Sequence, residues 1–323
     1  MRFVFRADAY ANSGAGHVMR TSALAEELIA NNYDVVFIGN SSEIPWVEEY
    51  VSTLGFSQIL DKSDMFTPNP KSDVLILDSY TLLPIDAFIA PNNWFKIIAF
   101  VDESSPPYLA DLYIDATLKS KWTHPETSEK IRILEGIEYI QIRKSLRQIS
   151  MKSKINIKLG TKILVVGGGS DPFNFVGELY KILSLLSLDF QATLITLDTK
   201  LSVIPEKFSL ALPGSGMMEL LEDADLVFST AGTSSWEFIY LGLPLGIASA
   251  IENQNINYEY QTETGLAVGI GFRGVNKEWI FDASAIYNLI SNPYVKMREP
   301  SIVDGKGVLR LYNKVMELVE LIN

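Results

Sequence analysis

The 323-residue sequence contains no cysteine and only two histidines, His17 and His124. The lack of cysteine excludes disulfides, thiolate zinc sites, iron–sulfur clusters and a cysteine nucleophile, and it is compatible with a reducing compartment. No apolar run reaches the roughly 18–20 residues that span a membrane. The first residues become charged too early for a secretory signal peptide, so we expect a cytoplasmic protein.

Basic residues are scarce relative to acidic ones. Lys and Arg number 27 against 39 Asp and Glu, which gives a formal net charge of -12. A surface of this sign repels phosphate backbones and anionic lipid, so we expect neither a nucleic-acid partner nor stable insertion into a membrane. Hydrophobic residues make up 47% of the chain, which suffices for a sizeable globular core. The sequence does not indicate an oligomeric state.

Short, continuous apolar runs alternate with helical stretches along the chain. In the first half, strands are expected at 1–5, 35–38, 74–77 and 97–101, with a helix at 21–29. The pattern restarts with strands at 162–166, 192–197, 225–229 and 245–248, and a helix at 175–186. Runs that are apolar throughout are typical of parallel strands covered on both faces. We therefore predict an α/β protein with two doubly wound, Rossmann-like domains that face a cleft.

The polar stretch Lys152-Ser153-Lys154 lies close to the restart and is predicted to be the linker. It divides the chain into a first domain, 1–153, and a second domain, 154–323. An amphipathic helix expected at 308–322 belongs to the second part in sequence, and we allow for its packing back on the first domain.

A loop with two glycines, Gly14 and Gly16, joins the first strand to the first helix. Glycine lets the backbone approach a ligand closely, and helix-start N–H groups face anions or polar oxygens. A dinucleotide fingerprint would need a third glycine where Met19 stands and an acidic residue where Gly39 and Asn40 end the second strand. The sequence therefore disfavours a nicotinamide or flavin, and we expect no cofactor.

His17 falls in the first turn of this helix. A helix N-terminus disfavours the imidazolium form, so the neutral form should prevail at neutral pH, which suits a general base. The alternative is a histidine that caps the helix or packs locally. His124 precedes a proline in a loop-like stretch and is interpreted as an ordinary loop residue.

A second helix start, Gly232-Thr233-Ser234, follows the strand expected at 225–229. A glycine and small hydroxylated residues at such a place can donate hydrogen bonds to a pyrophosphate. Glu237, one turn into the helix, can accept hydrogen bonds from two ribose hydroxyls. The alternative is a capped helix in which Glu237 only interacts with the helix dipole.

Two further loops lie at strand ends. The first contains Gly216 and Met217, which can lie against a flat base. The second offers the amides of Asn253 and Gln254 for sugar hydroxyls, although amide-rich loops are often ordinary turns.

Taken together, these segments resemble the UDP-sugar hydrolases of the pseudaminic-acid pathway, which are relatives of spore-coat polysaccharide proteins and of MurG-type GT-B glycosyltransferases. The matching segments are Phe5–Ala9, Gly14–Arg20, Leu77–Tyr80, Val101–Glu103, Gly168–Pro172, Thr230–Glu237, Gly242–Pro244 and Asn253–Gln254.

The resemblance implies a GT-B fold and release of UDP from UDP-2,4-diacetamido-2,4,6-trideoxy-β-L-altropyranose. It implies that His17 is the catalytic base, that Tyr80 and Asn253 line the sugar site and that Glu237 holds the ribose. The remaining sugar-site residues by this resemblance are Gly14, Gly16, Arg20 and Gln254. The remaining nucleotide-site residues are Gly169, Ser170, Gly216, Met217, Gly232, Thr233 and Ser234.

The sequence departs from the family pattern at two places. Ser235 stands where family members often carry a cysteine, and we expect this exchange to be mild. Tyr10-Ala11-Asn12 replaces a more serine-rich stretch, which leaves the identity of the sugar open. A related nonulosonic-acid or surface-polysaccharide pathway is equally compatible with the sequence.

The expected reaction is attack of water on the anomeric carbon, with UDP leaving through an oxocarbenium-like transition state. Neither an Asp-x-Asp pair nor a cluster of His, Asp and Glu is evident, so we predict a metal-independent hydrolase whose partner is a small UDP-sugar. Two alternatives stay open. One is a GT-B glycosyltransferase in which His17 deprotonates an acceptor hydroxyl, and the other is a non-catalytic UDP-sugar binding module.

Overall fold

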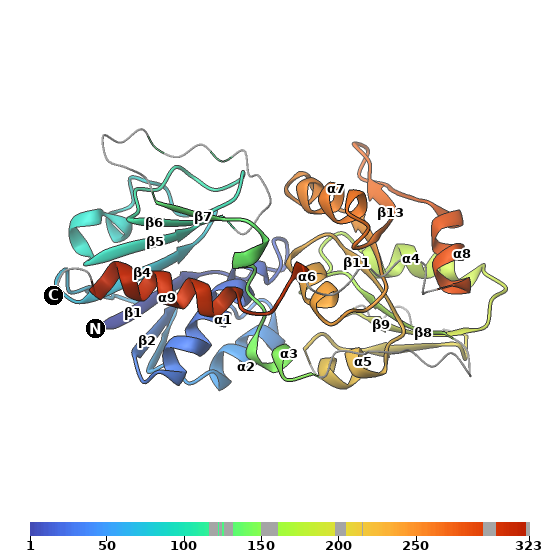
Figure 1. Cartoon of the computed structure of the whole chain (residues 1–323), viewed down its shortest axis with the longest axis horizontal. Coiled ribbons are helices and arrows are strands. Elements are labelled where there is room, and N and C mark those ends of the chain that lie inside the picture. The colour runs from blue at the N-terminus through green and yellow to red at the C-terminus, as the bar shows by residue number, and fades with distance from the viewer. Residues whose placement is uncertain are drawn as a thin grey trace. The chain divides into compact units, whose positions relative to one another are not determined.

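The computed structural model describes residues 1–115, 122, 125, 132–149, 161–197, 205–214, 216–292 and 302–320. The predicted linker, the boundary between 153 and 154 and His124 lie outside these residues. The chain divides into a first unit of Met1–Tyr10, Ala15–Lys144 and Gly305–Asn323 and a second unit of Ala11–Gly14 and Ser145–Asp304. Figure 1 labels the elements of both units.

The first unit is built around a parallel sheet with the strand order β3-β2-β1-β4-β5-β6-β7. Its strands are β1 (Arg2–Ala7), β2 (Asp34–Ile38), β3 (Gln58–Leu60), β4 (Asp73–Asp78), β5 (Lys96–Phe100), β6 (Leu112–Asp115) and β7 (Ile133–Glu135). The chain order reverses between β1 and β4. In open α/β sheets ligands bind outside the carboxyl ends of the strands at such a switch point.

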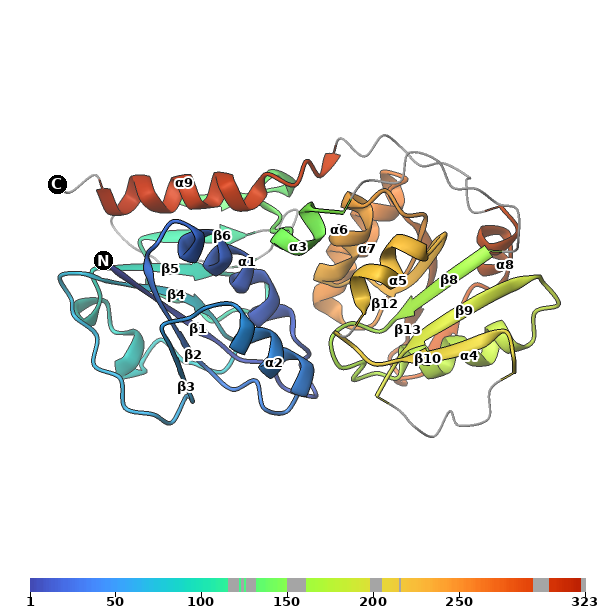
Figure 2. The same cartoon turned by 90° about the horizontal axis from the view of Figure 1, so that it is seen from below.

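The two faces of this sheet are covered differently. Helices α1 (Gly16–Ala30), α2 (Pro45–Thr53) and α9 (Gly307–Glu320) pack on the face that carries Phe3 and Phe5, and α9 lies beside α1 (Figure 2). The opposite face carries Val4 and Leu75 and is covered by loops and by the 3-10 helices η1 (Ala87–Ile89) and η2 (Pro91–Asn93). Alternation of side chains along each strand therefore separates two cores. Two short elements follow β7, namely η3 (Ile137–Tyr139) and α3 (Lys144–Arg147).

The second unit repeats this plan with the strand order β10-β9-β8-β11-β12-β13-β14, in which only β14 is antiparallel to its neighbour. Its strands are β8 (Thr161–Val166), β9 (Phe190–Ile195), β10 (Phe208–Ala211), β11 (Leu226–Thr230), β12 (Leu245–Ser249), β13 (Val268–Arg273) and β14 (Trp279–Phe281). Its helices are α4 (Phe175–Ser184), α5 (Met217–Asp223), α6 (Thr233–Tyr240), η4 (Glu252–Gln254), α7 (Asn255–Glu263) and α8 (Ala283–Ser291). The order reverses between β8 and β11.

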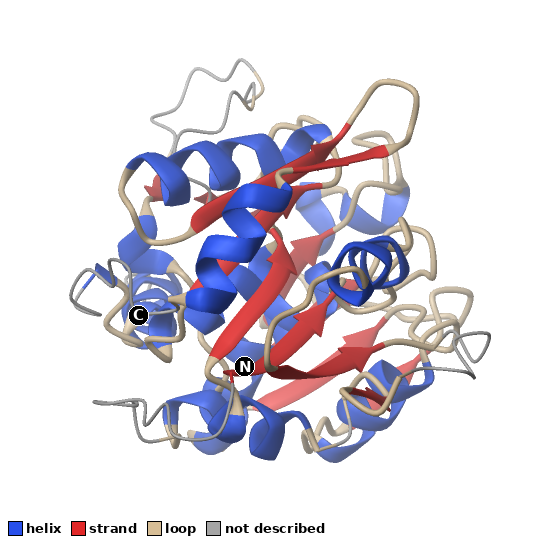
Figure 3. Cartoon of the chain, turned by 90° about the vertical axis from the view of Figure 1, so that its right-hand side faces the viewer, coloured by secondary structure: helices blue, strands red, loops and turns tan. Residues whose placement is uncertain are grey.

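Helices lie on both sides of the strands in the second unit, which faces the viewer in Figure 3. Helices α4 and α8 share one core with residues such as Val165 and Phe228. The prediction of two doubly wound α/β units is thus confirmed, whereas the predicted cleft and domain boundary stay predictions. In the described part of the chain, no helix combines the length and the hydropathy needed to cross a membrane.

The start of α9 offers a test of its packing. A Cβ atom on Gly307 would collide with the carbonyl oxygen of Ile140, and backbone cannot move aside cheaply. We expect Gly307→Ala to lower the free energy of unfolding by about 1–3 kcal/mol in urea titrations. The matched control is Gly177→Ala inside α4, where the atoms nearest to the new methyl group belong to the side chain of Asn174, which can move, and the gain in helix propensity is about 1 kcal/mol. Equal stability of Gly307→Ala and wild type would contradict this packing.

Candidate active site

Helix α1 carries two of the predicted residues, His17 and Arg20, at the carboxyl edge of the first sheet. The helix starts at Gly16, and its N-cap residue, Ala15, provides no side-chain hydrogen bond. His17 lies in the first turn and Arg20 lies three residues later, so the two side chains are neighbours on the helix surface. His17 is 9% exposed. The helix therefore presents an imidazole beside a guanidinium.

Asp78 joins these two side chains. It is the last residue of β4 and follows the alternation of Val74 and Ile76, which face the helical layer. Its carboxylate is fully buried and lies 2.5 Å from Nδ1 of His17. Arg20 donates to the same carboxylate from Nε at 2.5 Å and from Nη2 at 2.7 Å. One buried charge thus binds both α1 residues.

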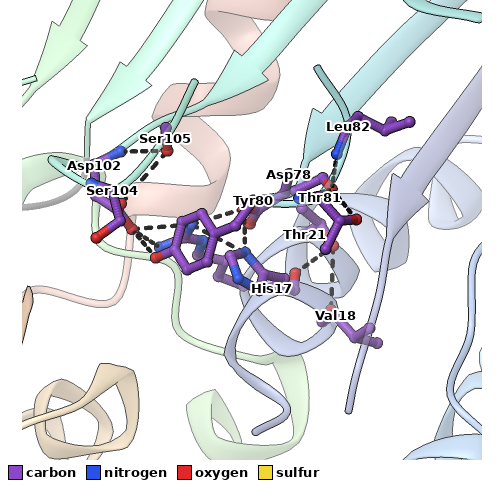
Figure 4. Close-up of polar contacts among 12 residues, drawn as sticks. His17, Val18, Thr21, Asp78, Tyr80, Thr81, Leu82, Asp102, Ser104 and Ser105 are labelled. Atoms are coloured by element: carbon purple, nitrogen blue, oxygen red, sulfur yellow. Dashed lines mark hydrogen bonds and ion pairs between the residues drawn. The ribbon is translucent and has the colours of Figure 1, made fainter. Parts of the chain in front are cut away.

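A second carboxylate, Asp102, follows β5 and extends the network. The hydroxyl of Tyr80 donates to it at 2.5 Å, and Nη1 and Nη2 of Arg20 both lie 3.5 Å from it. The backbone N–H of Ser104 donates to its other oxygen at 3.0 Å. The Tyr80 ring packs edge-on against the His17 ring, with centroids 4.3 Å apart. Figure 4 shows this chain of contacts around His17.

The contacts change the acidity of three groups. Burial raises the pKa of Asp78, but the charges of Arg20 and His17 and their hydrogen bonds outweigh burial, so this pKa is lowered. Burial lowers the pKa of Arg20, but Asp78 and Asp102 together raise it well above its usual value. Burial and the charge of Asp102 raise the pKa of Tyr80 against the opposing charge of Arg20. At neutral pH Asp78 is therefore an ionised carboxylate, Arg20 is a cation and Tyr80 is a neutral phenol.

Asp78 and Asp102 are absent from the residues predicted from the sequence as site residues. Each directly follows a continuous apolar run, and the two strands that these runs form, β4 and β5, are neighbours in the sheet. The carboxyl ends of adjacent parallel strands meet at one edge, so these two positions were detectable as a pair of acidic residues at that edge.

In the second unit, two helix starts differ in how their N–H groups are satisfied. Asp171, before α4, accepts hydrogen bonds from the N–H groups of Phe175 at 2.7 Å and Val176 at 3.0 Å. Helix α6 starts after Gly232, an N-cap residue that provides no side-chain hydrogen bond. An uncapped helix start leaves N–H groups for an anion. The geometry therefore favours α6, not α4, as the anion-binding helix.

Three loops at the carboxyl edge of the second sheet come together near this helix start. A Cβ atom placed on Gly168 or on Gly232 would lie 4.0 Å from the hydroxyl of Thr230, so the loops after β8 and β11 are adjacent. The same atom on Gly232 would lie 3.5 Å from Nε2 of Gln254, in the loop after β12. Gln254 is held in place because its Oε1 accepts the N–H of Ala250 at 3.0 Å.

The other predicted residues of the second unit take varied positions. Thr233 and Ser234 are half-buried in the first turn of α6, and Glu237 is 6% exposed one turn later. Gly216 is the exposed N-cap of α5 and has a φ of 63°, which suits glycine. Half-buried positions are shared by Gly169, Ser170, Met217 and Asn253. Gly14 belongs to the second unit, whereas Gly16 and Tyr80 belong to the first.

Ser235 has a structural role behind the α6 start. It is fully buried, donates to the carbonyl oxygen of Gly232 at 2.7 Å and accepts from Nε2 of Gln261 on α7 at 2.8 Å. Asn257, also on α7, accepts from Nε1 of Trp236 at 3.3 Å. Helix α7 thus holds the first turn of α6. A thiol is a weaker acceptor than a hydroxyl, so a cysteine here would weaken a buried hydrogen bond.

In the part of the chain that the structure describes, no group of three or more His, Asp or Glu side chains could hold a metal ion.

The lowered pKa of Asp78 leads to a pH-dependent stability prediction. Because this folded-state pKa lies below the value of about 3.9 in an unfolded chain, the ionised carboxylate stabilises the fold above roughly pH 4, and this contribution is lost as the pH falls through the folded-state pKa. We expect Asp78→Asn to lower the free energy of unfolding at pH 7 by about 3–5 kcal/mol, with a smaller difference from wild type in acid. Urea titrations of both proteins at pH 7 and in acid measure the difference. A pH-independent difference would contradict the assignment.

Comparison with known proteins places the chain among distant relatives. No protein-family model matches it. An uncharacterized protein of Methanocaldococcus jannaschii is 27% identical over 281 residues, which cover 79% of this chain and 57% of the relative, so the chain spans little more than half of that protein. The spore coat polysaccharide biosynthesis protein SpsG of Bacillus subtilis is 22% identical over 338 residues, with 97% of each chain covered.

Solved structures share the architecture along the whole chain. The UDP co-structure of Staphylococcus aureus MnaA has a TM-score of 0.64 at 13% identity and covers 99% of this chain and 97% of its own. MurG of Acinetobacter baumannii has a TM-score of 0.57 at 12% identity and covers 98% of this chain and 100% of its own. At such identities the likeness concerns the fold alone. Together with the two doubly wound sheets, it establishes that this chain has a GT-B-like fold.

Proposed function

We propose that this chain is a UDP-sugar hydrolase in which His17 removes a proton from the water that attacks the anomeric carbon. The observation that carries the proposal is the 2.5 Å contact between Nδ1 of His17 and the buried carboxylate of Asp78. A carboxylate that holds one imidazole nitrogen and stabilises the imidazolium form is the arrangement that general-base catalysis by histidine requires.

The charges around His17 support this role. Asp78 and Asp102 carry two negative charges, and Arg20 offsets one of them. With a neutral imidazole the network holds one excess negative charge, and proton uptake by His17 cancels it. A histidine that only packs or caps needs no such arrangement.

The second unit supplies the proposed nucleotide site. The open start of α6 would place the N–H groups of Thr233 and Ser234 toward the leaving diphosphate, with Glu237 one turn away for the ribose. The loops of Gly169, Ser170 and Gln254 flank this helix start in the same proposal. Charge that develops on the diphosphate would be stabilised by these backbone N–H groups.

The proposed substrate is a UDP-linked diacetamido-trideoxy sugar in pseudaminic-acid, nonulosonic-acid or surface-polysaccharide biosynthesis. The motif resemblance supports the class of sugar. The Bacillus subtilis relative is named as a spore coat polysaccharide biosynthesis protein, and it aligns along 97% of this chain. The identity of 22% leaves the exact sugar to experiment.

A glycosyltransferase is the second candidate, because the fold that this chain shares with MurG does not by itself distinguish hydrolysis from glycosyl transfer. In that reaction the same histidine would deprotonate an acceptor hydroxyl instead of water. The two candidates and the non-catalytic alternative differ in the products that they release and in whether an acceptor is required. A hydrolase releases UDP and free sugar with no acceptor present, a transferase releases UDP only with an acceptor, and a non-catalytic binding module releases none.

The first test is incubation of the purified chain with a panel of UDP-sugars and no acceptor. We expect wild type to release UDP and free sugar, and His17→Asn to do so about 10²–10⁴-fold more slowly with unchanged affinity for UDP. His124→Asn is the matched control and should keep wild-type turnover. If His17→Asn melts at a lower temperature but keeps normal turnover per folded molecule, His17 has a structural role and the hydrolase mechanism fails.

The second test concerns nucleotide binding by Glu237. A hydrogen bond to a charged group contributes about 1.5–3 kcal/mol, so Glu237→Gln should weaken UDP binding roughly tenfold or more in calorimetry. Glutamine keeps the volume of this buried side chain, and Glu263→Gln on the exposed side of α7 serves as the control. An unchanged dissociation constant for Glu237→Gln would remove Glu237 from the nucleotide site.

A further inference from the structure

We propose that Asp78 is a positioning residue that holds His17 as the Nδ1–H tautomer and so leaves the lone pair on Nε2. A neutral imidazole carries its proton on either nitrogen, and the partner of one nitrogen decides which form is present. At pH 7 a carboxylate with a lowered pKa has no proton to donate. The short contact from Asp78 to Nδ1 is therefore a hydrogen bond only if Nδ1 is the donor.

Arg20 provides an independent argument for the same tautomer. Its Nη2 lies 3.4 Å from Nδ1 of His17, but it also donates to Asp78 at 2.7 Å, which is the better hydrogen bond. If Nδ1 carried the lone pair for Arg20, that lone pair would face an oxygen of Asp78 at 2.5 Å, which is repulsive. Only the Nδ1–H form satisfies both partners of the carboxylate.

Tyr80 and Asp102 hold the ring in this orientation. The two aromatic planes meet at 85°, so rotation of the imidazole would push it into the Tyr80 ring. Tyr80 cannot move aside easily because its hydroxyl donates to Asp102. Asp102 is itself held in place, because its carboxylate accepts from the N–H of Ser104 and its own N–H donates to the hydroxyl of Ser105. Asp102 thus acts through Tyr80, and Asp78 acts directly on His17.

The catalytic consequence rests on the proposed function, whereas the tautomer itself does not. If His17 is the base, Nε2 is the atom that takes the proton. Asp78→Asn would present an amide that can donate to Nδ1, which favours the Nε2–H form and removes the basic lone pair. A comparable Asp-to-Asn exchange in serine proteases lowers turnover about 10⁴-fold through the wrong tautomer, so a drop of about 10²–10⁴-fold is expected here.

The experiment is ¹⁵N NMR of the imidazole nitrogens in the full-length, labelled protein at neutral to mildly alkaline pH. The chain has only two histidines, so the imidazole signals that remain in His124→Asn are those of His17. We expect wild-type His17 to show a protonated, pyrrole-type Nδ1 and an unprotonated, pyridine-type Nε2. This measurement needs no variant of the network, so a folding defect cannot obscure it. A pyridine-type Nδ1 in wild type would overturn the proposal.

Two variants then test the cause. Asp78→Asn should shift His17 toward the Nε2–H form. The matched control is Asp73→Asn, which removes a buried, arginine-paired carboxylate from the other end of the same strand and should leave the His17 tautomer unchanged. An unchanged tautomer in folded Asp78→Asn, or an equal shift in Asp73→Asn, would overturn the role of Asp78.

The same data separate this proposal from the proposed function. If wild type has the Nδ1–H tautomer but His17→Asn keeps normal turnover, the base assignment fails and the tautomer assignment stands. If His17→Asn loses turnover but wild type has the Nε2–H tautomer, the base assignment stands and the positioning role of Asp78 fails.

Discussion

The candidate active site depends on the carboxylate of Asp78. This group is completely buried, yet it remains ionised because His17 and Arg20 both donate to it. Removal of such a charge leaves its partners without compensation, which is costly in a low-dielectric interior. Each of the three side chains therefore needs the other two. Asp102 and Tyr80 complete the arrangement. Asp102 accepts from Arg20, and the Tyr80 ring packs edge-on against the imidazole ring.

The second unit also combines groups that can bind a ligand with buried residues that hold those groups in place. Helix α6 can offer its N–H groups because its N-cap residue, Gly232, has no side chain to cap them, whereas Asp171 accepts hydrogen bonds from the first turn of α4. The first turn of α6 is held from behind by Ser235 and Gln261, which are both fully buried. The hydrogen bond from Nε2 of Gln261 to Ser235 ties α7 to the first turn of α6 and so helps to set the geometry of this turn.

Continuous apolar runs made the fold predictable, because a strand covered on both faces has little choice of composition. The runs at 35–38, 74–77 and 162–166 lie within β2, β4 and β8. The helix expected at 21–29 begins earlier, at Gly16, since a small-residue loop carries no periodic signal. Short elements such as β7 and β14 were not predicted, because strands of 3 residues are defined by their pairing and not by their own composition.

The sequence by itself determined the doubly wound architecture, the two glycine-containing helix starts and the placement of His17 in a first helical turn, all of which follow from local composition and spacing. Only the tertiary structure decided which charge stands beside His17. Asp78 lies 61 positions further along the chain and meets the imidazole because β4 pairs with β1 and the carboxyl ends of both strands share one edge. Spacing along a chain carries no information about such pairing, since strand order is set by packing of the whole sheet.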